Sequence, residues 1–276
     1  MEESMKLYGM ELFKIVGRKF TWIATGLLTF MLVFFAGEID NWVTQETISL
    51  YGEHLGYYEF MQMSQFFVMC VMVWMTVVLS SFYCEDRQSR TDVLIMTSAK
   101  GKLTDFSIRV GVTYTLTIGA LVFVLMTAYL ICYVRYGYSG GDASVGEIFF
   151  WLDKAVPAPA ESSILSFIGY YLINVLCAVV MLAGLIVWIS ARSNKTMYSL
   201  IAISGIFWGP IMLENGLRTN GISFLFITAQ PMYLAVMRYL EEADWRTYGW
   251  RIAMALFVAA AGIICGGRRW CLPRKV

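Results

Sequence analysis

Six apolar runs, each close to the length that crosses a lipid bilayer, constrain the fold of this chain more than any other feature. A bilayer core of roughly 30 Å takes about 20 apolar residues in a helix. The runs lack the alternation typical of barrel strands, and a helix satisfies its own backbone hydrogen bonds in lipid. We therefore predict an all-α integral membrane protein with six transmembrane helices. The predicted spans cover about residues 20–36, 61–83, 110–134, 164–189, 198–212 and 251–266.

The overall composition agrees with this interpretation. Hydrophobic residues make up 58% of the sequence and charged residues only 15%, whereas soluble domains are near half apolar and about a quarter charged. A water-soluble core cannot absorb this excess of apolar side chains. The pattern contains no internal repeat and no separate soluble segment, so we expect a single transmembrane domain over residues 1–276.

The basic residues are distributed unevenly between the two sets of loops. Fifteen of the 21 Lys and Arg residues fall in the N-terminal segment, the second and fourth connections and the C-terminal tail. The first connection, by contrast, carries five acidic residues and no basic one: Glu38, Asp40, Glu46, Glu53 and Glu59. The positive-inside rule then predicts a multi-pass protein of the cell membrane with both termini in the cytoplasm. The net charge of +1 conceals this polarity and gives no indication of a nucleic-acid partner.

The segment before the first span has the pattern of an amphipathic helix, over about residues 4–19. We expect it to lie on the inner leaflet, in contact with membrane lipids, either as an anchor or as a regulatory element. One arc of the helix is apolar and the opposite arc is polar. The apolar arc holds Met5, Tyr8, Leu12, Phe13, Ile15 and Val16, and the polar arc holds Lys6, Glu11, Lys14 and Arg18.

Two apolar stretches between the fifth and sixth spans are too short to cross a bilayer. They cover residues 222–229 and 232–240 and are separated by Gln230 and Pro231. Helical segments of this length enter a membrane only part of the way. We predict an outer re-entrant helical pair over residues 221–240.

Catalytic and metal-binding patterns are missing from the sequence. The six cysteines form no CxxC pair and His54 is the only histidine, so no zinc site is expected. Gly101-Lys102 matches part of the phosphate-binding motif GxxxxGK[ST], but the upstream Gly and the following Ser or Thr are missing. The pair Glu241-Glu242, followed by Arg246, resembles the EExxxR motif of an intramembrane endopeptidase, but no histidine follows it. We predict no catalytic residue, no metal site and no bound cofactor in this chain.

The polar residues inside the spans are few. Apart from Arg251 at an edge, the predicted spans contain no ionisable residue other than cysteine and tyrosine, which weakens a proton- or sodium-coupled mechanism. Polar groups in spans most often form hydrogen bonds between helices, although some line a path for a substrate. The candidates for such a path are Thr113, Thr117, Tyr170 and Asn174.

The connection between the second and third spans, residues 84–107, combines a polar composition with the apolar patch Val93-Leu94-Ile95-Met96. Thr91 can cap a short helix that has Asp92 in its first turn, and Lys100 follows near its end. We therefore predict a short helix over about residues 91–100, parallel to the membrane, whose apolar patch requires a partner.

The stretch 86–102 resembles the cytoplasmic loop of the permease subunits of ABC-2-type transporters. That loop contains a carboxylate, a Gly-Thr pair, an aliphatic run, Thr-Ser-Pro, and basic residues at the foot of the third span. Two positions differ, because Arg90 replaces the Gly and Ala99 replaces the Pro. The matching positions are Glu85 or Asp86, Thr91, Leu94-Ile95-Met96, Thr97-Ser98, Lys102 and Arg109.

The resemblance implies an ATP-driven exporter in which this chain is the non-enzymatic membrane subunit. It implies a complex of two permease chains, as a homodimer or a heterodimer, with two ABC ATPase subunits that hold ATP and Mg. The alternative is a non-transporting scaffold or sensory subunit, and a third reading is an intramembrane enzyme. An apolar lining would suit peptides, lipids or drugs equally. The implied ATPase-coupling residues are Glu85, Asp86, Thr91, Asp92, Leu94, Ile95, Met96, Lys100, Lys102 and Arg109.

Overall fold

The computed structural model describes residues 2–42, 52–84, 101–145, 163–214, 231 and 245–271. Within these ranges the chain is helical, and the only strand-like pairing is an isolated bridge between Ser144 and Ser163. The helices are α1 (Glu2–Val16), α2 (Lys19–Trp42), the 3-10 turn η1 (Gly52–His54), α4 (Leu55–Leu79), α7 (Gly101–Tyr136), α9 (Ile164–Arg192), α10 (Thr196–Glu214) and α13 (Trp245–Cys271).

Five of the helices in the described ranges are long and apolar enough to cross a membrane, which agrees with a multi-span helical protein. These segments are Lys19–Glu38, Gly52–Leu79, Lys102–Tyr136, Ile164–Arg192 and Tyr248–Cys271. The predicted run 198–212 falls within α10, whose described apolar part, Thr196–Phe207, is shorter. A sixth span therefore remains a prediction.

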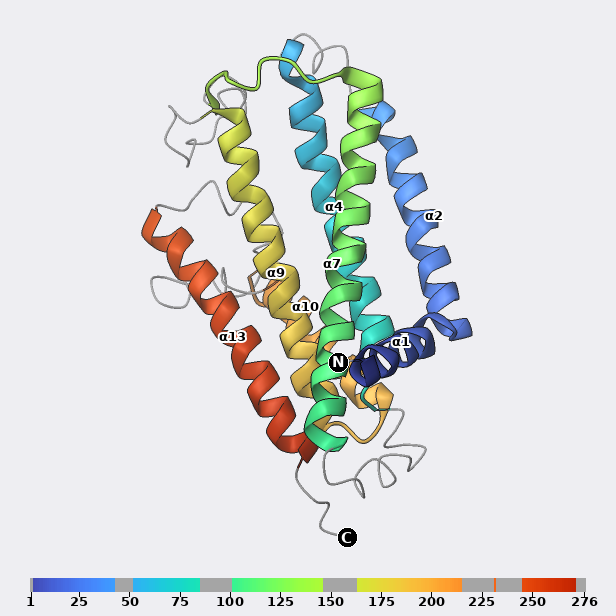
Figure 1. Ribbon diagram of the computed structural model, residues 1–276. Coiled ribbons are helices and arrows are strands. Elements are labelled where there is room, and N and C mark those ends of the chain that lie inside the picture. The colour runs from blue at the N-terminus through green and yellow to red at the C-terminus, as the bar shows by residue number, and fades with distance from the viewer. Residues whose placement is uncertain are drawn as a thin grey trace.

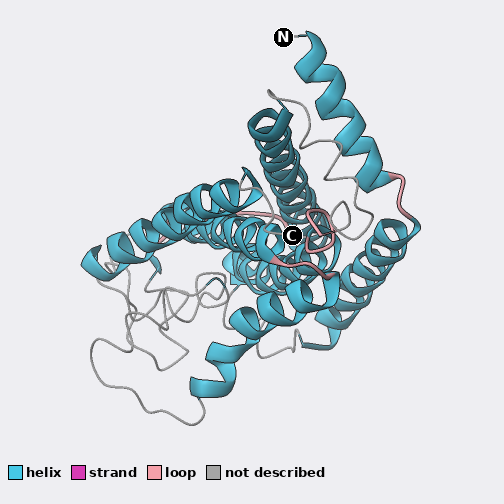
Figure 2. Cartoon of the chain, turned by 90° about the horizontal axis from the view of Figure 1, so that it is seen from below, coloured by secondary structure: helices cyan, strands magenta, loops and turns pink. Residues whose placement is uncertain are grey.

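The long helices α4, α7, α9 and α13 run along one another, and α2 lies at the edge of the bundle beside α4 (Figure 1). α1 is inclined steeply to them and lies near the foot of α7. Seen along the bundle from below, α1 occupies the edge of this end of the molecule (Figure 2). One end of the bundle therefore brings together α1 and the termini of several long helices.

The predicted N-terminal amphipathic helix corresponds to α1, which ends at Val16. The chain then turns at Gly17 and Arg18 and enters α2 at Lys19. Ile15 is fully buried, and the hydroxyl of Tyr8 donates to Thr115 Oγ1 of α7 at 2.6 Å. Phe13, by contrast, is 76% exposed and free to enter lipid. α1 thus presents one side to α7 and an apolar side outward.

The backbones of α9 and α13 approach each other closely. An ideal Cβ added to Gly184 would lie 2.6 Å from Ala259 Cα, and one added to Gly262 would overlap the carbonyl group of Gly184. Small residues permit such contact because no side chain separates the backbones. The buried stripe of α13 that faces this contact consists of Arg251, Ala255, Ala259, Gly262, Gly266 and Trp270.

Apolar side chains outside these contacts point away from the bundle. On α2, Trp22, Leu27 and Phe30 are 60% or more exposed, and on α7 Phe123 is 61% exposed. In lipid such surfaces are solvated by acyl chains, so their exposure in the isolated chain is expected of a membrane protein. The predicted re-entrant region 221–240 lies, apart from Pro231, outside the described residues.

Candidate functional site

Arg109 is the centre of a buried polar network at the foot of α7. Its side chain is fully buried. The guanidinium Nε donates to both oxygens of Asp105, one turn earlier on the same helix, at 3.2 and 3.0 Å. Nη2 lies 3.4 Å from Glu11 Oε1 on α1. Nη1 donates to the carbonyl oxygen of Phe82 at 3.3 Å. A buried cation needs such partners because its desolvation is costly.

Two aromatic rings lie beside this guanidinium. Arg109 Cζ is 5.2 Å from the ring centroid of Phe82 and 5.1 Å from that of Trp270, near the end of α13. Arginine over an aromatic ring adds a favourable cation–π interaction in a site without water. The side chain of Arg109 therefore connects α1, the end of α4, the foot of α7 and the end of α13.

Tyr83 extends the network from the residue next to Phe82. Its ring meets the ring of Trp270 edge to face, with centroids 6.0 Å apart. Its hydroxyl shares a hydrogen bond of 3.2 Å with Thr113 Oγ1.

The turn after α4 is held by further contacts. Arg18 Nη1 donates to Ser81 Oγ at 3.0 Å, and its guanidinium lies 5.9 Å from the Phe82 ring centroid. The thiol of Cys84 donates to the carbonyl oxygen of Ser190, on α9, at 3.5 Å. The described chain stops at Cys84 and resumes at Gly101. The described residues that flank segment 85–100 therefore contact the same cluster of helix ends.

The predicted coupling residues divide into two groups. Lys102 is partly buried and Arg109 is fully buried, both on α7. α7 begins at Gly101, so residues 101–107, which sequence analysis assigned to the connection, continue the helix of the third span. The others lie outside the described residues: Glu85, Asp86, Thr91, Asp92, Leu94, Ile95, Met96 and Lys100.

The polar residues proposed for a path are not gathered at one point. Thr113 bonds to Tyr83, toward the foot of α7. The backbone carbonyl of Tyr170, near the start of α9, accepts from the Tyr248 hydroxyl at 3.1 Å. Thr117 and Asn174 are buried, and their side chains find no hydrogen-bond partner among the described residues. A common path through these four residues remains a prediction.

Sequence reasoning missed several members of the Arg109 network. Asp105 was available as an acid four residues before Arg109 on one helix, which is the spacing of a helical ion pair. Glu11 was assigned to the polar arc of α1, yet it faces Arg109. Trp270, near the end of α13, contacts the same guanidinium. The contacts of Glu11 and Trp270 with Arg109 depend on how α1 and α13 pack against α7. A local sequence pattern does not indicate this packing.

Two buried charged residues, Glu59 and Arg251, lie in helices at positions that the predicted spans left outside or at an edge. Glu59 falls within α4, and its side chain is 6% exposed. Arg251 falls within α13, and its side chain is 1% exposed. The helices begin earlier than the apolar runs, so the spans predicted from the sequence left these residues outside or at an edge.

The described ranges contain no cluster of three His, Cys, Asp or Glu side chains that could hold a metal ion. Comparisons of the chain with protein-family models, with curated proteins and with solved structures give no match.

Proposed function

We propose that this chain is the membrane-spanning permease subunit of an ATP-driven ABC-2-type exporter, coupled to a separate ATPase through segment 84–107. The proposal combines the sequence pattern of that segment with the Arg109 network. In it, two permease chains form the path, and two ATPase subunits bind ATP and Mg. The loops rich in basic residues face the cytoplasm.

The observation that carries the proposal is that described residues on both sides of segment 85–100 meet around Arg109. Phe82 contacts the guanidinium just before the segment, and Asp105 binds it just after. Glu11 and Trp270 contact the same group from α1 and α13. A displacement of the segment would therefore act on four helices at once. Coupling requires such a connection, because a partner can bias a membrane domain only through contacts that differ between two states.

The apolar patch supplies the docking surface in this mechanism. Burying Leu94 or Ile95 against a partner would contribute on the order of 1.5–3 kcal/mol each, whereas an exposed charge such as Lys100 would add about 0–1 kcal/mol. Loss of an aliphatic anchor should therefore weaken the complex more than loss of a charge.

The test is purification of the tagged full chain from the membranes of cells that produce it. We expect a polypeptide with a phosphate-binding loop to copurify and to hydrolyse ATP. The variant Leu94→Asp should lose this ATPase, while Lys100→Ala should retain most of it. Both variants should insert normally, because their spans are unchanged.

A full complement of ATPase on Leu94→Asp would contradict the docking assignment. The ATPase could instead bind the chain while its turnover in reconstituted vesicles responds to no transported compound. That result would favour the scaffold or sensory alternative.

A further inference from the structure

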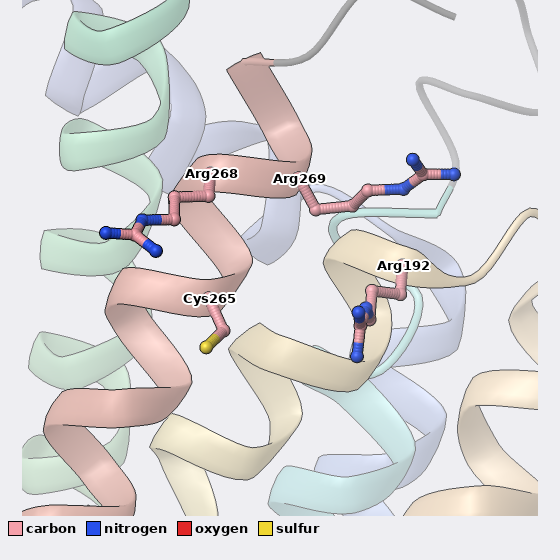
Figure 3. Close-up of a pocket in the computed structure, with 4 residues that line it drawn as sticks. All are labelled: Arg192, Cys265, Arg268 and Arg269. Atoms are coloured by element: carbon pink, nitrogen blue, oxygen red, sulfur yellow. The ribbon is translucent and has the colours of Figure 1, made fainter. Parts of the chain in front are cut away.

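A basic pocket lies where α9 and α13 end, on the same side of the molecule as the Arg109 network. It has a volume of about 460 Å³ and is lined by Arg192, Cys265, Arg268 and Arg269. Arg192 is the last residue of α9, and the other two arginines stand in the last turn of α13. Figure 3 shows Arg268 and Arg269 extending to opposite sides of the end of α13, with Arg192 of α9 on the side of Arg269, so the three guanidinium groups are not gathered at one point. A small anionic group such as a phosphate could contact only some of the three at once, and the others would add positive charge around it.

The positive charge of the pocket exceeds what the helix ends can balance. Each helix C-terminus carries a partial charge of about −0.5, so two of them offset about one of the three arginines. Among the described residues, no carboxylate forms a salt bridge with any of the three; the salt bridges of Arg109 lie elsewhere, with Glu11 and Asp105. The pocket is therefore complementary to an anion.

The surroundings of the pocket fit a ligand that is part charged and part apolar. Phe257 and Ile264 are 66% and 56% exposed and share a face of α13 with Arg268, by helical spacing. On α9, the Arg192 guanidinium lies 5.5 Å from the ring centroid of Trp188, one turn deeper. Arginine and tryptophan at a helix end are typical of the headgroup level of a membrane, and the apolar face continues toward the acyl chains.

We infer that this pocket binds the phosphate headgroup of an anionic phospholipid from the adjacent leaflet, with its acyl chains along the exposed face of α13. Basic pockets between the inner ends of membrane helices have the chemistry for such headgroups. This site is separate from the proposed docking segment. The lipid site requires only that α9 and α13 cross the membrane. It does not depend on whether an ATPase binds the chain.

The test measures protection of Cys265, which is exposed and lines the pocket. The full chain carrying Cys271→Ser is placed in nanodiscs of phosphatidylcholine, with or without phosphatidylglycerol, and treated with uncharged N-ethylmaleimide. Phosphatidylglycerol should slow the modification of Cys265 several-fold. Adding Arg192→Gln and Arg269→Gln should raise the phosphatidylglycerol concentration needed for protection about tenfold or more.

The matched control is Lys19→Gln with Lys195→Gln, which removes two exposed charges at the same end but outside the pocket. It should retain full protection. Equal protection of the arginine variant would mean that the anionic surface slows the reaction of the thiol without the pocket, and would overturn the site. Equal protection by inorganic phosphate in phosphatidylcholine nanodiscs would indicate a free-anion site instead. Protection by a copurified protein without anionic lipid would also overturn the proposal.

Discussion

Arg109 shows how one buried cation can organise the end of a helical bundle. Its guanidinium satisfies two carboxylates and a backbone carbonyl, and two aromatic rings shield it from water. The sequence pattern places Arg109 among the residues that act on a partner. Because its side chain is fully buried, the contribution that we propose for it is positional: it holds the described residues that flank segment 85–100 close to α1 and α13.

Replacing Arg109 should be costly because its partners would lose their charge compensation. For Arg109→Leu we expect a loss of about 3–5 kcal/mol in unfolding free energy, the range for breaking a buried ion pair. The control Arg135→Leu, an exposed arginine on the same helix, should cost less than about 1 kcal/mol. Thermal and denaturant unfolding in detergent measures both. Similar losses for the two variants would contradict the central role of Arg109.

At the scale of elements, the pair α9 and α13 is held by close backbone contact rather than by large side chains. Gly184, Ala259 and Gly262 form this contact. In lipid the association of helices depends on packing, because apolar side chains gain little by leaving acyl chains for one another. The same pair positions the three arginines of the basic pocket, so its spacing controls the width of that site.

Adding one methyl group should separate these two helices. Gly262→Ala should lower stability by about 1–3 kcal/mol, because the new Cβ would overlap the Gly184 carbonyl group. Gly119→Ala on α7 is the matched control. Its Cβ would meet no atom within 4 Å, so the better helix propensity of alanine should raise stability by about 0.5–1 kcal/mol. Opposite shifts in detergent melting temperature are expected, and a stabilising Gly262→Ala would contradict the observed contact.

At the scale of the whole molecule, the orientation in the membrane remains a prediction from charge. The network and the basic pocket lie at one end of the bundle, and the described turn 137–145 follows α7 at the opposite end, beside the start of α9 (Figure 1). Positive-inside bias puts the first end in the cytoplasm.

Cysteine labelling on intact cells tests this orientation. In a background with Cys265→Ser and Cys271→Ser, an impermeant thiol reagent should label Asp142→Cys and should not label Asn194→Cys. Both positions are exposed, and they lie in the turns after α7 and after α9. Labelling of Asn194→Cys alone would reverse the orientation, and with it the assignment of segment 84–107 to the cytoplasm.

Hydropathy and helical periodicity, read from the sequence alone, determined the class of this protein and the position of most helices. The predicted runs 61–83 and 164–189 correspond to α4 and α9, and the amphipathic N-terminal segment corresponds to α1. These helices can be predicted because hydropathy and helical periodicity depend only on residues that are close together in the sequence. The ends were less accurate: α7 extends to Gly101 because polar residues near an interface remain helical.

Only the tertiary structure decided which polar residues meet. Glu11 and Arg109 are 98 positions apart in sequence, and their pairing depends on the packing of α1 against α7. The basic pocket likewise combines Arg192 with residues of α13 that lie more than seventy positions away. Such contacts depend on long-range packing that no local pattern encodes. The sequence therefore determined a multi-span helical protein, and the packing of helix ends decided where its buried charge network and its anion-binding pocket are formed.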